Sequence, residues 1–149
     1  MNQDFVDLLR AFSDRGVEHI VVGAHALAAH GHVRATKDLD VWIRPTSENA
    51  ARAWGALAAF GAPLTELSEE DLATPGTIFQ IGVAPVRIDI LTRIDAVEFD
   101  EAWKARVPAS FGGTPTAVLS REHLLRNKRA AGRLQDLADV ERLERGEGD

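Results

Sequence analysis

Three aspartates stand inside apolar stretches, where a charged side chain is costly. Asp38 and Asp40 belong to the segment DLDVWI, and Asp89 belongs to the segment VRIDIL. Such runs are typical of buried strands, and an unpaired charge is strongly unfavourable there. Residues two apart on a strand face the same side, so Asp38 and Asp40 point together. A divalent cation would relieve their repulsion, and Asp89 from a neighbouring strand would complete an oxygen-rich site suited to magnesium.

A glycine upstream of these acids predicts a second chemical feature. Gly23 ends a short apolar strand over residues 19–22, and an alanine-rich helix is expected over residues 24–30, ended by Gly31. Glycine lets the backbone approach a ligand closely, and the N–H groups at a helix start favour phosphate. Gly23 and Ala24 are therefore expected to cradle a phosphate through their backbone. A phosphate cradle followed by three carboxylates is what phosphoryl or nucleotidyl transfer requires.

The same residues resemble a known family signature. Val22-Gly23-Ala24, a spacer of 13 residues and Asp38-Leu39-Asp40-Val41 look like the signature of the polymerase-beta-like nucleotidyltransferase superfamily. Residues 30–40 are similar to small bacterial members, which include the nucleotidyltransferase toxins of abortive-infection toxin–antitoxin systems, and residues 124–140 resemble their last helices. The resemblance spans roughly residues 17–143. It implies a mixed sheet flanked by helices, two magnesium ions and a bound nucleoside triphosphate.

One position departs from that signature. Family members usually carry serine or glycine where this chain has Ala24. A serine hydroxyl there can bind a phosphate, whereas alanine offers only its backbone N–H. The departure leaves the three carboxylates intact and lowers the triphosphate affinity that the resemblance implies.

Several charged residues have two interpretations each. Arg34 and Lys37 precede the acids, and they are either solvated loop charges or contacts to the triphosphate. Lys128 lies on a predicted helix, where it either pairs with Asp136 and other nearby acids or reaches the phosphates, as the family resemblance favours. Asp136 and Asp139 share a helical face, and they are expected at the surface or in pairing between helices rather than on a metal.

Three histidines near the acidic segment invite a metal interpretation. His25, His30 and His32 lie close together in the sequence. Positions five apart on a helix do not share a face, so His25 and His30 would chelate poorly. A histidine metal site is therefore not expected, and lining the nucleotide pocket is the alternative role.

Composition limits the function classes. The chain has 149 residues, 45% of them hydrophobic, which suits one globular domain over residues 1–149 with a frayed end at 146–149. The absence of cysteine excludes disulfides, thiol catalysis and zinc–thiolate sites. No stretch long enough to span a bilayer and no signal-peptide pattern is present, so a cytoplasmic location is expected. A net charge of -6 disfavours broad nucleic-acid binding, although a local basic patch could engage an RNA end.

Apolar periodicity predicts an α/β (α+β) fold with a mixed sheet flanked by helices. An amphipathic helix is expected over residues 4–13, with Phe5, Leu8, Leu9 and Phe12 forming its buried stripe. The further elements expected are a strand over residues 38–43, a helix over 47–60, a short helical turn over 68–72, strands over 77–82 and 86–91 in a hairpin that carries Asp89, a helix over 95–106, extended segments beside 112–113, and one or two helices from 120 to about 145.

Together these features predict a magnesium-dependent nucleotidyltransferase. A hydroxyl would attack the α-phosphate of a nucleoside triphosphate, and pyrophosphate would leave. Asp38 and Asp40 would hold both metal ions, while Asp89 would hold the catalytic ion and help deprotonate the acceptor. The expected acceptor is RNA or protein, within a toxin–antitoxin system.

Two alternatives stay open. One is a non-catalytic nucleotide- or protein-binding module of a toxin–antitoxin pair, which Ala24 slightly favours. The other is an enzyme that modifies a small molecule such as an antibiotic. The chain offers no second domain to hold an acceptor, so a homodimer or a toxin or antitoxin partner would complete an enzymatic site.

Overall fold

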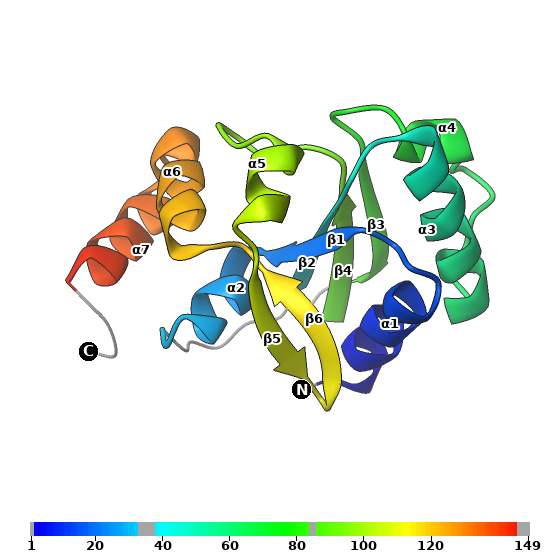
Figure 1. Cartoon of the computed structure of the whole chain (residues 1–149), viewed down its shortest axis with the longest axis horizontal. Coiled ribbons are helices and arrows are strands. Elements are labelled where there is room, and N and C mark those ends of the chain that lie inside the picture. Colours follow the sequence, from blue (N-terminus) through cyan, green and yellow to red (C-terminus); the bar gives the residue numbers. More distant parts are fainter. Residues whose placement is uncertain (1, 33–37, 84–85, 146–149) are drawn as a thin grey trace.

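The computed structural model describes residues 2–32, 38–83 and 86–145. Within these ranges the chain forms a six-stranded mixed sheet and seven helices, which confirms the predicted fold class (Figure 1). The helices are α1 (Gln3–Asp14), α2 (Gly23–Ala29), α3 (Ser47–Phe60), α4 (Glu69–Leu72), α5 (Phe99–Lys104), α6 (Arg121–Ala131) and α7 (Leu134–Glu144). The strands are β1 (His19–Val22), β2 (Asp38–Ile43), β3 (Ile78–Val83), β4 (Val86–Leu91), β5 (Val107–Phe111) and β6 (Thr114–Val118).

The strand order places the acid-bearing strands side by side. The sheet runs β3-β4-β2-β1-β6-β5. β2 is parallel to β4 and antiparallel to β1, and the register sets Asp40 opposite Asp89 on β4 and opposite Val22 on β1. Since Gly23 follows Val22, the start of α2 also lies beside Asp40. Three segments far apart in the sequence therefore meet at one end of β2.

Helices cover the sheet on both sides. In Figure 1, α1, α3 and α4 lie on one side, and α2, α6 and α7 lie on the other. The predicted stripe of α1 is confirmed, because Leu8, Leu9 and Phe12 have no exposed surface. Their burial fixes α1 against the core.

The helix expected over residues 95–106 is shorter than predicted. α5 spans only Phe99–Lys104. Before it, an isolated bridge joins Ile94 to Val97, and Ala96 has a φ of 67°. That turn buries Val97, and a capping box at Glu98 then starts the helix. Helical periodicity alone does not reveal a left-handed residue, so the prediction for residues 95–98 was wrong.

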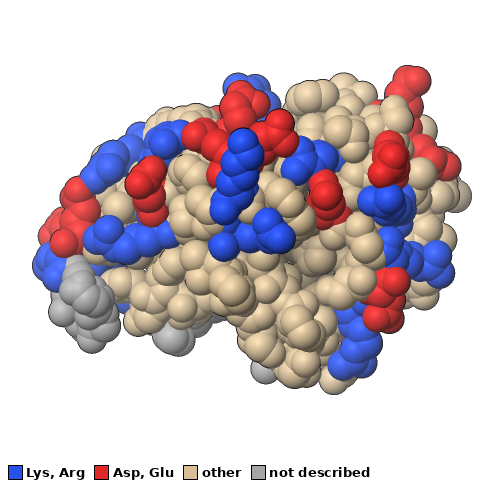
Figure 2. All heavy atoms as spheres, in the orientation of Figure 1, with Lys and Arg blue, Asp and Glu red and all other residues tan. Residues whose placement is uncertain are grey.

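Charges of both signs are mixed on the surface. Figure 2 shows Lys and Arg interspersed with Asp and Glu on the face seen in Figure 1, and the area over the β5–β6 hairpin carries neither. No continuous basic face is visible in that view. Among the described residues no helix is long and apolar enough to cross a bilayer.

Candidate active site

A cleft with a volume of about 590 Å³ opens over the ends of β1, β2 and β4 and is bounded by α6 and the start of α7. Asp38, Asp40 and Asp89 all line it, and so do Gly23 and Lys128. The structure thus brings together five residues that the sequence analysis singled out. Ala24 follows Gly23 in the first turn of α2 and is not among the residues that line the cleft. Arg34 and Lys37 lie outside the described residues.

The three carboxylates interact strongly with one another. Asp40 and Asp89 are opposite in the β2–β4 register, and Asp89 is only 8% exposed. Burial, together with the neighbouring charges of Asp89 and Asp38, raises the pKa of Asp40 to about 6. A carboxyl group with that pKa carries a proton far more readily than a solvated one. The site therefore has an excess of negative charge that favours a cation.

The guanidinium of Arg87 offsets part of the negative charge of these acids. Its Nε donates to Asp89 Oδ1 at 2.9 Å, and its Nη2 donates to Asp38 Oδ2 at 3.1 Å and to Asp89 Oδ2 at 3.3 Å. Hydrogen bonding to Asp89 raises the pKa of the Arg87 guanidinium above its usual range. One side chain therefore bridges two of the three acids.

Gly23 is required by sterics as well as by backbone conformation. Its φ is 68°, in the left-handed region that favours glycine. A Cβ atom at this position would lie 2.3 Å from Asp40 Oδ2. The close approach predicted for a ligand is thus already used by the carboxylate of Asp40. Any side chain at position 23 would push that carboxylate away.

The first turn of α2 leaves its backbone donors without a side-chain cap. α1, α3 and α6 each begin with a cap, in which Asn2, Thr46 or Ser120 accepts from a backbone N–H. Val22 occupies that position in α2 and provides no such bond. Among the described residues, no side chain caps the backbone amides at this edge of the cleft, as a phosphate cradle requires.

The opposite wall of the cleft contains a buried ion cluster. Lys128 Nζ lies 2.9 Å from Asp139 Oδ2 and 3.5 Å from Asp136 Oδ1. Asp136 also accepts from Arg133 Nε at 2.6 Å, and Asp139 accepts from the Gln135 amide at 3.0 Å. Burial would raise the pKa of Asp136, but hydrogen bonds from Arg133 and the charges of Arg133 and Lys128 lower it overall.

This cluster supports the pairing interpretation of Lys128, whereas its contact with the phosphates stays a prediction. The lysine is 6% exposed and pairs with acids of α7, which is the structural alternative. The expectation that Asp136 and Asp139 lie at the surface was wrong, since they are 1% and 0% exposed. The other expectation for them, pairing between helices, is confirmed.

The histidines lie away from the cleft. His25 packs edge-on against Phe5, with ring centroids 5.5 Å apart, and burial lowers its pKa. His30 Nε2 lies 2.8 Å from the carbonyl oxygen of Leu119. Neither these two nor His32 lines the cleft, so the pocket-lining alternative was wrong.

The donor set suits magnesium in its chemistry. Three carboxylates on adjacent strands supply hard oxygen ligands, and the raised pKa of Asp40 shows that they are crowded enough to benefit from a cation. As the side chains stand, no three acidic or histidine residues in the described ranges are grouped closely enough to hold one ion. The Arg87 guanidinium lies on Asp38 and Asp89, so side-chain rotation must precede coordination.

Arg87 is the functional residue that the sequence analysis missed. A signal was present, because Arg87 and Asp89 are two apart on one strand and therefore share a face. Other missed lining residues, Arg93, Asp95 and Asn127, had no such signal. They come from a loop and a helix, and only the tertiary fold brings them to the strands.

Comparison with known proteins supports the fold. No protein-family model and no curated protein sequence matches the chain. The antibiotic-resistance factor ANT(2'')-Ia has a TM-score of 0.64 at 17% identity, over 95% of this chain and 80% of that one. The lincosamide antibiotic adenylyltransferase LnuA has a TM-score of 0.61 at 12% identity, over 97% and 96% of the two chains. TM1012 from Thermotoga maritima, assigned as a nucleotidyltransferase, has a TM-score of 0.58 at 16% identity, over 97% and 93%. The chain therefore has a fold of the nucleotidyltransferase type.

Proposed function

We propose that this protein is a magnesium-dependent nucleotidyltransferase that moves a nucleoside monophosphate from a nucleoside triphosphate to a hydroxyl acceptor. The observation that carries the proposal is the meeting of Asp38, Asp40 and Asp89 in one cleft beside the uncapped start of α2. Carboxylates alone would suit many sites. Carboxylates next to free backbone donors suit a metal-bound phosphate chain.

The residues have separate roles in this proposal. Asp38 and Asp40 hold the metal ions, and Asp89 holds the catalytic one. When bound, magnesium would neutralise charge on the triphosphate and activate the hydroxyl. The backbone N–H groups of Gly23 and Ala24 bind phosphate oxygens. The contribution of Arg34 and Lys37 to triphosphate binding stays a prediction.

In the transfer step, one bond to the α-phosphorus forms and one breaks. The acceptor oxygen forms a bond to the α-phosphorus, and the bond from that phosphorus to the bridging oxygen of pyrophosphate breaks. The hydroxyl proton passes to the carboxylate of Asp89. Lys128 contributes positive charge to the facing wall while it stays paired with Asp139 at 2.9 Å.

A protein or RNA hydroxyl within a toxin–antitoxin system is one candidate acceptor. A small antibiotic is the second, and the solved structures favour it specifically: LnuA is lincomycin-bound, and ANT(2'')-Ia has been solved with adenylyl-2''-tobramycin. Transfer to either acceptor would use the same three carboxylates, so the identity of the acceptor does not change the proposed chemistry.

The test is label transfer from the four nucleoside triphosphates labelled at the α-phosphate, with magnesium. The acceptors offered are cell lysate, total RNA, an aminoglycoside and a lincosamide. We expect the wild type to label one of them, and we expect Asp89→Asn to bind triphosphate within a few-fold of wild type while labelling nothing. Asp7→Asn, on the opposite side of the molecule, is the matched control and should label like wild type.

Each contrary outcome has a distinct meaning. Nucleotide binding without any labelled acceptor would favour the non-catalytic binding module. If no triphosphate binds in the presence of magnesium, the proposed function is contradicted. Transfer by Asp89→Asn at the wild-type rate would make Asp89 a structural acid.

A further inference from the structure

The contacts of Arg87 engage the same oxygens that the proposed function assigns to a metal. Arg87 makes three hydrogen bonds of 2.9, 3.1 and 3.3 Å, all to oxygens of Asp89 and Asp38. A guanidinium bound in this way satisfies two carboxylates with a fixed planar fork. A cation that coordinates these carboxylates would lie beside the guanidinium charge, so the two positive groups would compete for the same acids.

The position of Arg87 on the sheet determines its contact with the two acids. Arg87 lies two residues before Asp89 on β4, and it is the register partner of Asp38 on β2. Strand geometry therefore directs all three side chains to the same face. About one third of the Arg87 side chain is exposed, against 11% for Asp89. The Arg87 side chain therefore reaches solvent, whereas that of Asp89 is almost enclosed.

We propose that Arg87 is an internal counter-ion that competes with the divalent cation for Asp38 and Asp89, and so sets how tightly the site binds metal. This inference rests on the proposed function, because that function requires the cation. While Arg87 bridges the acids, it holds β2 and β4 in register and offsets their repulsion. A divalent cation carries twice the charge and displaces the guanidinium.

Two consequences follow for the binding of ions. The site should have lower affinity for metal than three carboxylates alone would give, because the Arg87 guanidinium already offsets part of the negative charge that attracts the metal. Arg87 should also be freed when metal binds. A liberated guanidinium beside a metal-bound phosphate chain would itself pair with phosphate oxygens.

The experiment measures Mn²⁺ binding to the full chain by calorimetry and by the electron paramagnetic resonance of free Mn²⁺, at low ionic strength and without nucleotide. Arg87→Gln removes the charge and keeps the side-chain amide. Arg93→Gln is the matched control, since Arg93 lines the same cleft and has no ion pair among the described residues. We expect Arg87→Gln to bind Mn²⁺ on the order of tenfold more tightly than wild type, and Arg93→Gln to stay within about threefold.

A stability readout separates competition from a simple structural role. In chelator, Arg87→Gln should melt below wild type because the acids lose their counter-ion. Mn²⁺ should then raise its melting temperature more than it raises that of the wild type. Arg87→Lys, which keeps the charge without the fork, should be intermediate in affinity and guards against a misfolded Arg87→Gln.

A signal from the wild type completes the test. The Arg87 Nε–H resonance, assigned by its loss in Arg87→Lys, should shift and exchange faster with solvent as Mg²⁺ saturates the site. Equal Mn²⁺ affinity in wild type, Arg87→Gln and Arg93→Gln would overturn the inference while leaving the proposed function standing. Failure of all variants to bind Mn²⁺ would overturn both.

Discussion

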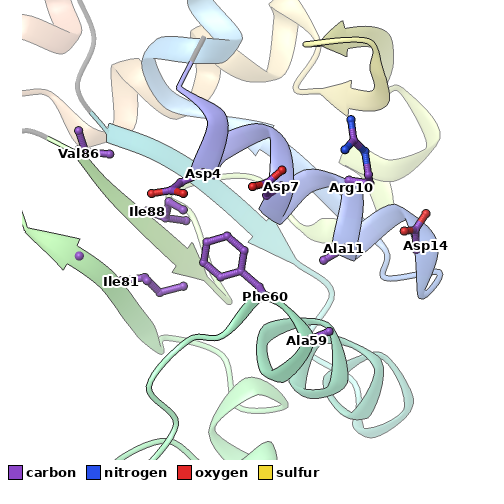
Figure 3. A pocket seen from close by; sticks show the side chains of 11 residues that line it. Asp4, Asp7, Arg10, Ala11, Asp14, Ala59, Phe60, Ile81, Val86 and Ile88 are labelled. Carbon is purple, nitrogen blue, oxygen red and sulfur yellow. The ribbon is translucent and has the colours of Figure 1, made fainter.

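Two hollows of this molecule are lined by aspartates, and they differ in how the acids are presented. One is the cleft of Asp38, Asp40 and Asp89. The other, with a volume of about 450 Å³, lies between α1, the end of α3 and the β3–β4 hairpin. In Figure 3, Asp4 and Asp7 lie along one side of this second hollow, the strand residues lie along the other, and Phe60 lies between them.

The two hollows differ in whether their acids are solvated separately or held against one another. Asp4 and Asp14 are exposed on α1, and Asp7 is partly exposed and accepts from Gln3 at 2.8 Å. Such acids are solvated, and Asp4 in the first turn also suits the helix dipole. In the cleft, adjacent strands force the carboxylates to face one another, and burial together with the charges of Asp89 and Asp38 raises the pKa of Asp40. Only the arrangement in the cleft gains from a cation.

The largest expected effect is on the rate of nucleotidyl transfer, when an acid of the cleft is neutralised and an acid of the other hollow serves as the control. Asp40→Asn removes the most strongly perturbed carboxylate and should lower nucleotidyl transfer on the order of a thousandfold, the scale typical of lost electrostatic stabilisation. Asp7→Asn should leave it within about twofold. Rates are measured with a labelled triphosphate and the acceptor that the label-transfer test identifies. Comparable losses in both variants would mean that the two hollows are not functionally distinct.

The steric demand of the cleft gives the next effect. Gly23→Ala should destabilise the protein by about 3 kcal/mol, through left-handed strain and overpacking. Gly16 has nearly the same φ, 67°, and a Cβ there would meet nothing within 4 Å, so Gly16→Ala measures the strain alone. Urea unfolding should show that Gly23→Ala costs more.

A double mutant isolates the clash in that comparison. In an Asp40→Ala background the nearest oxygen is gone, so Gly23→Ala should then cost about as much as Gly16→Ala. If Gly23→Ala lowers the free energy of unfolding equally with and without Asp40, the loss does not come from a clash with the Asp40 carboxylate.

The pH dependence of stability should be smaller in size but specific to Asp40. Its folded pKa of about 6 lies above the ordinary value of 3.8, so the folded state binds the proton more tightly. Asp40 therefore favours folding at low pH, and that contribution is lost as pH rises from about 4 to about 6. The loss is at most about 3 kcal/mol at roughly 1.4 kcal/mol per unit of pKa shift.

Denaturation in chelator at several pH values tests this sign. The Asp40→Asn variant should gain stability relative to wild type as the pH rises through that window, and the difference should level off near pH 7. Parallel curves for the two proteins would contradict the raised pKa.

The smallest effect concerns the phosphate cradle. Ala24→Ser adds a hydroxyl at the start of α2, which has no side-chain cap. One hydrogen bond to a charged group should tighten triphosphate binding by up to about tenfold. Titration calorimetry in magnesium checks it against Ala28→Ser, at the far end of the same helix. Unchanged affinity would mean that phosphate is bound in another way, or not at this helix.

The acid-bearing strands could be predicted because β2 and β4 place their acids within largely apolar runs. β1 and β2 have the predicted bounds, and the hairpin of β3 and β4 carries Asp89 as expected. Alternation along a strand fixed the shared face of Asp38 and Asp40. The same rule applied to Arg87 would have found its contact with Asp89, whereas the contact with Asp38 depends on the register between β2 and β4.

The walls of the cleft could not be predicted in the same way. Helical spacing showed that Asp136 and Asp139 share a face, but it did not show that the face is buried against α6. Burial of charge depends on a partner brought by the tertiary fold, here Lys128. The turn at Ala96 was missed for a related reason, since a left-handed alanine is imposed by the Ile94–Val97 bridge and not by its own preference.

The buried ion cluster also determines how the cleft can open. If α7 moved away from α6, Lys128 would be separated from Asp136 and Asp139, and these groups carry almost no exposed surface. Partial separation would leave charges without either water or partner, which is the least favourable arrangement. The two helices should therefore part in a single cooperative event. For amide hydrogen exchange, this means that the donors of α7 open together, at one shared rate, and not progressively from the chain end.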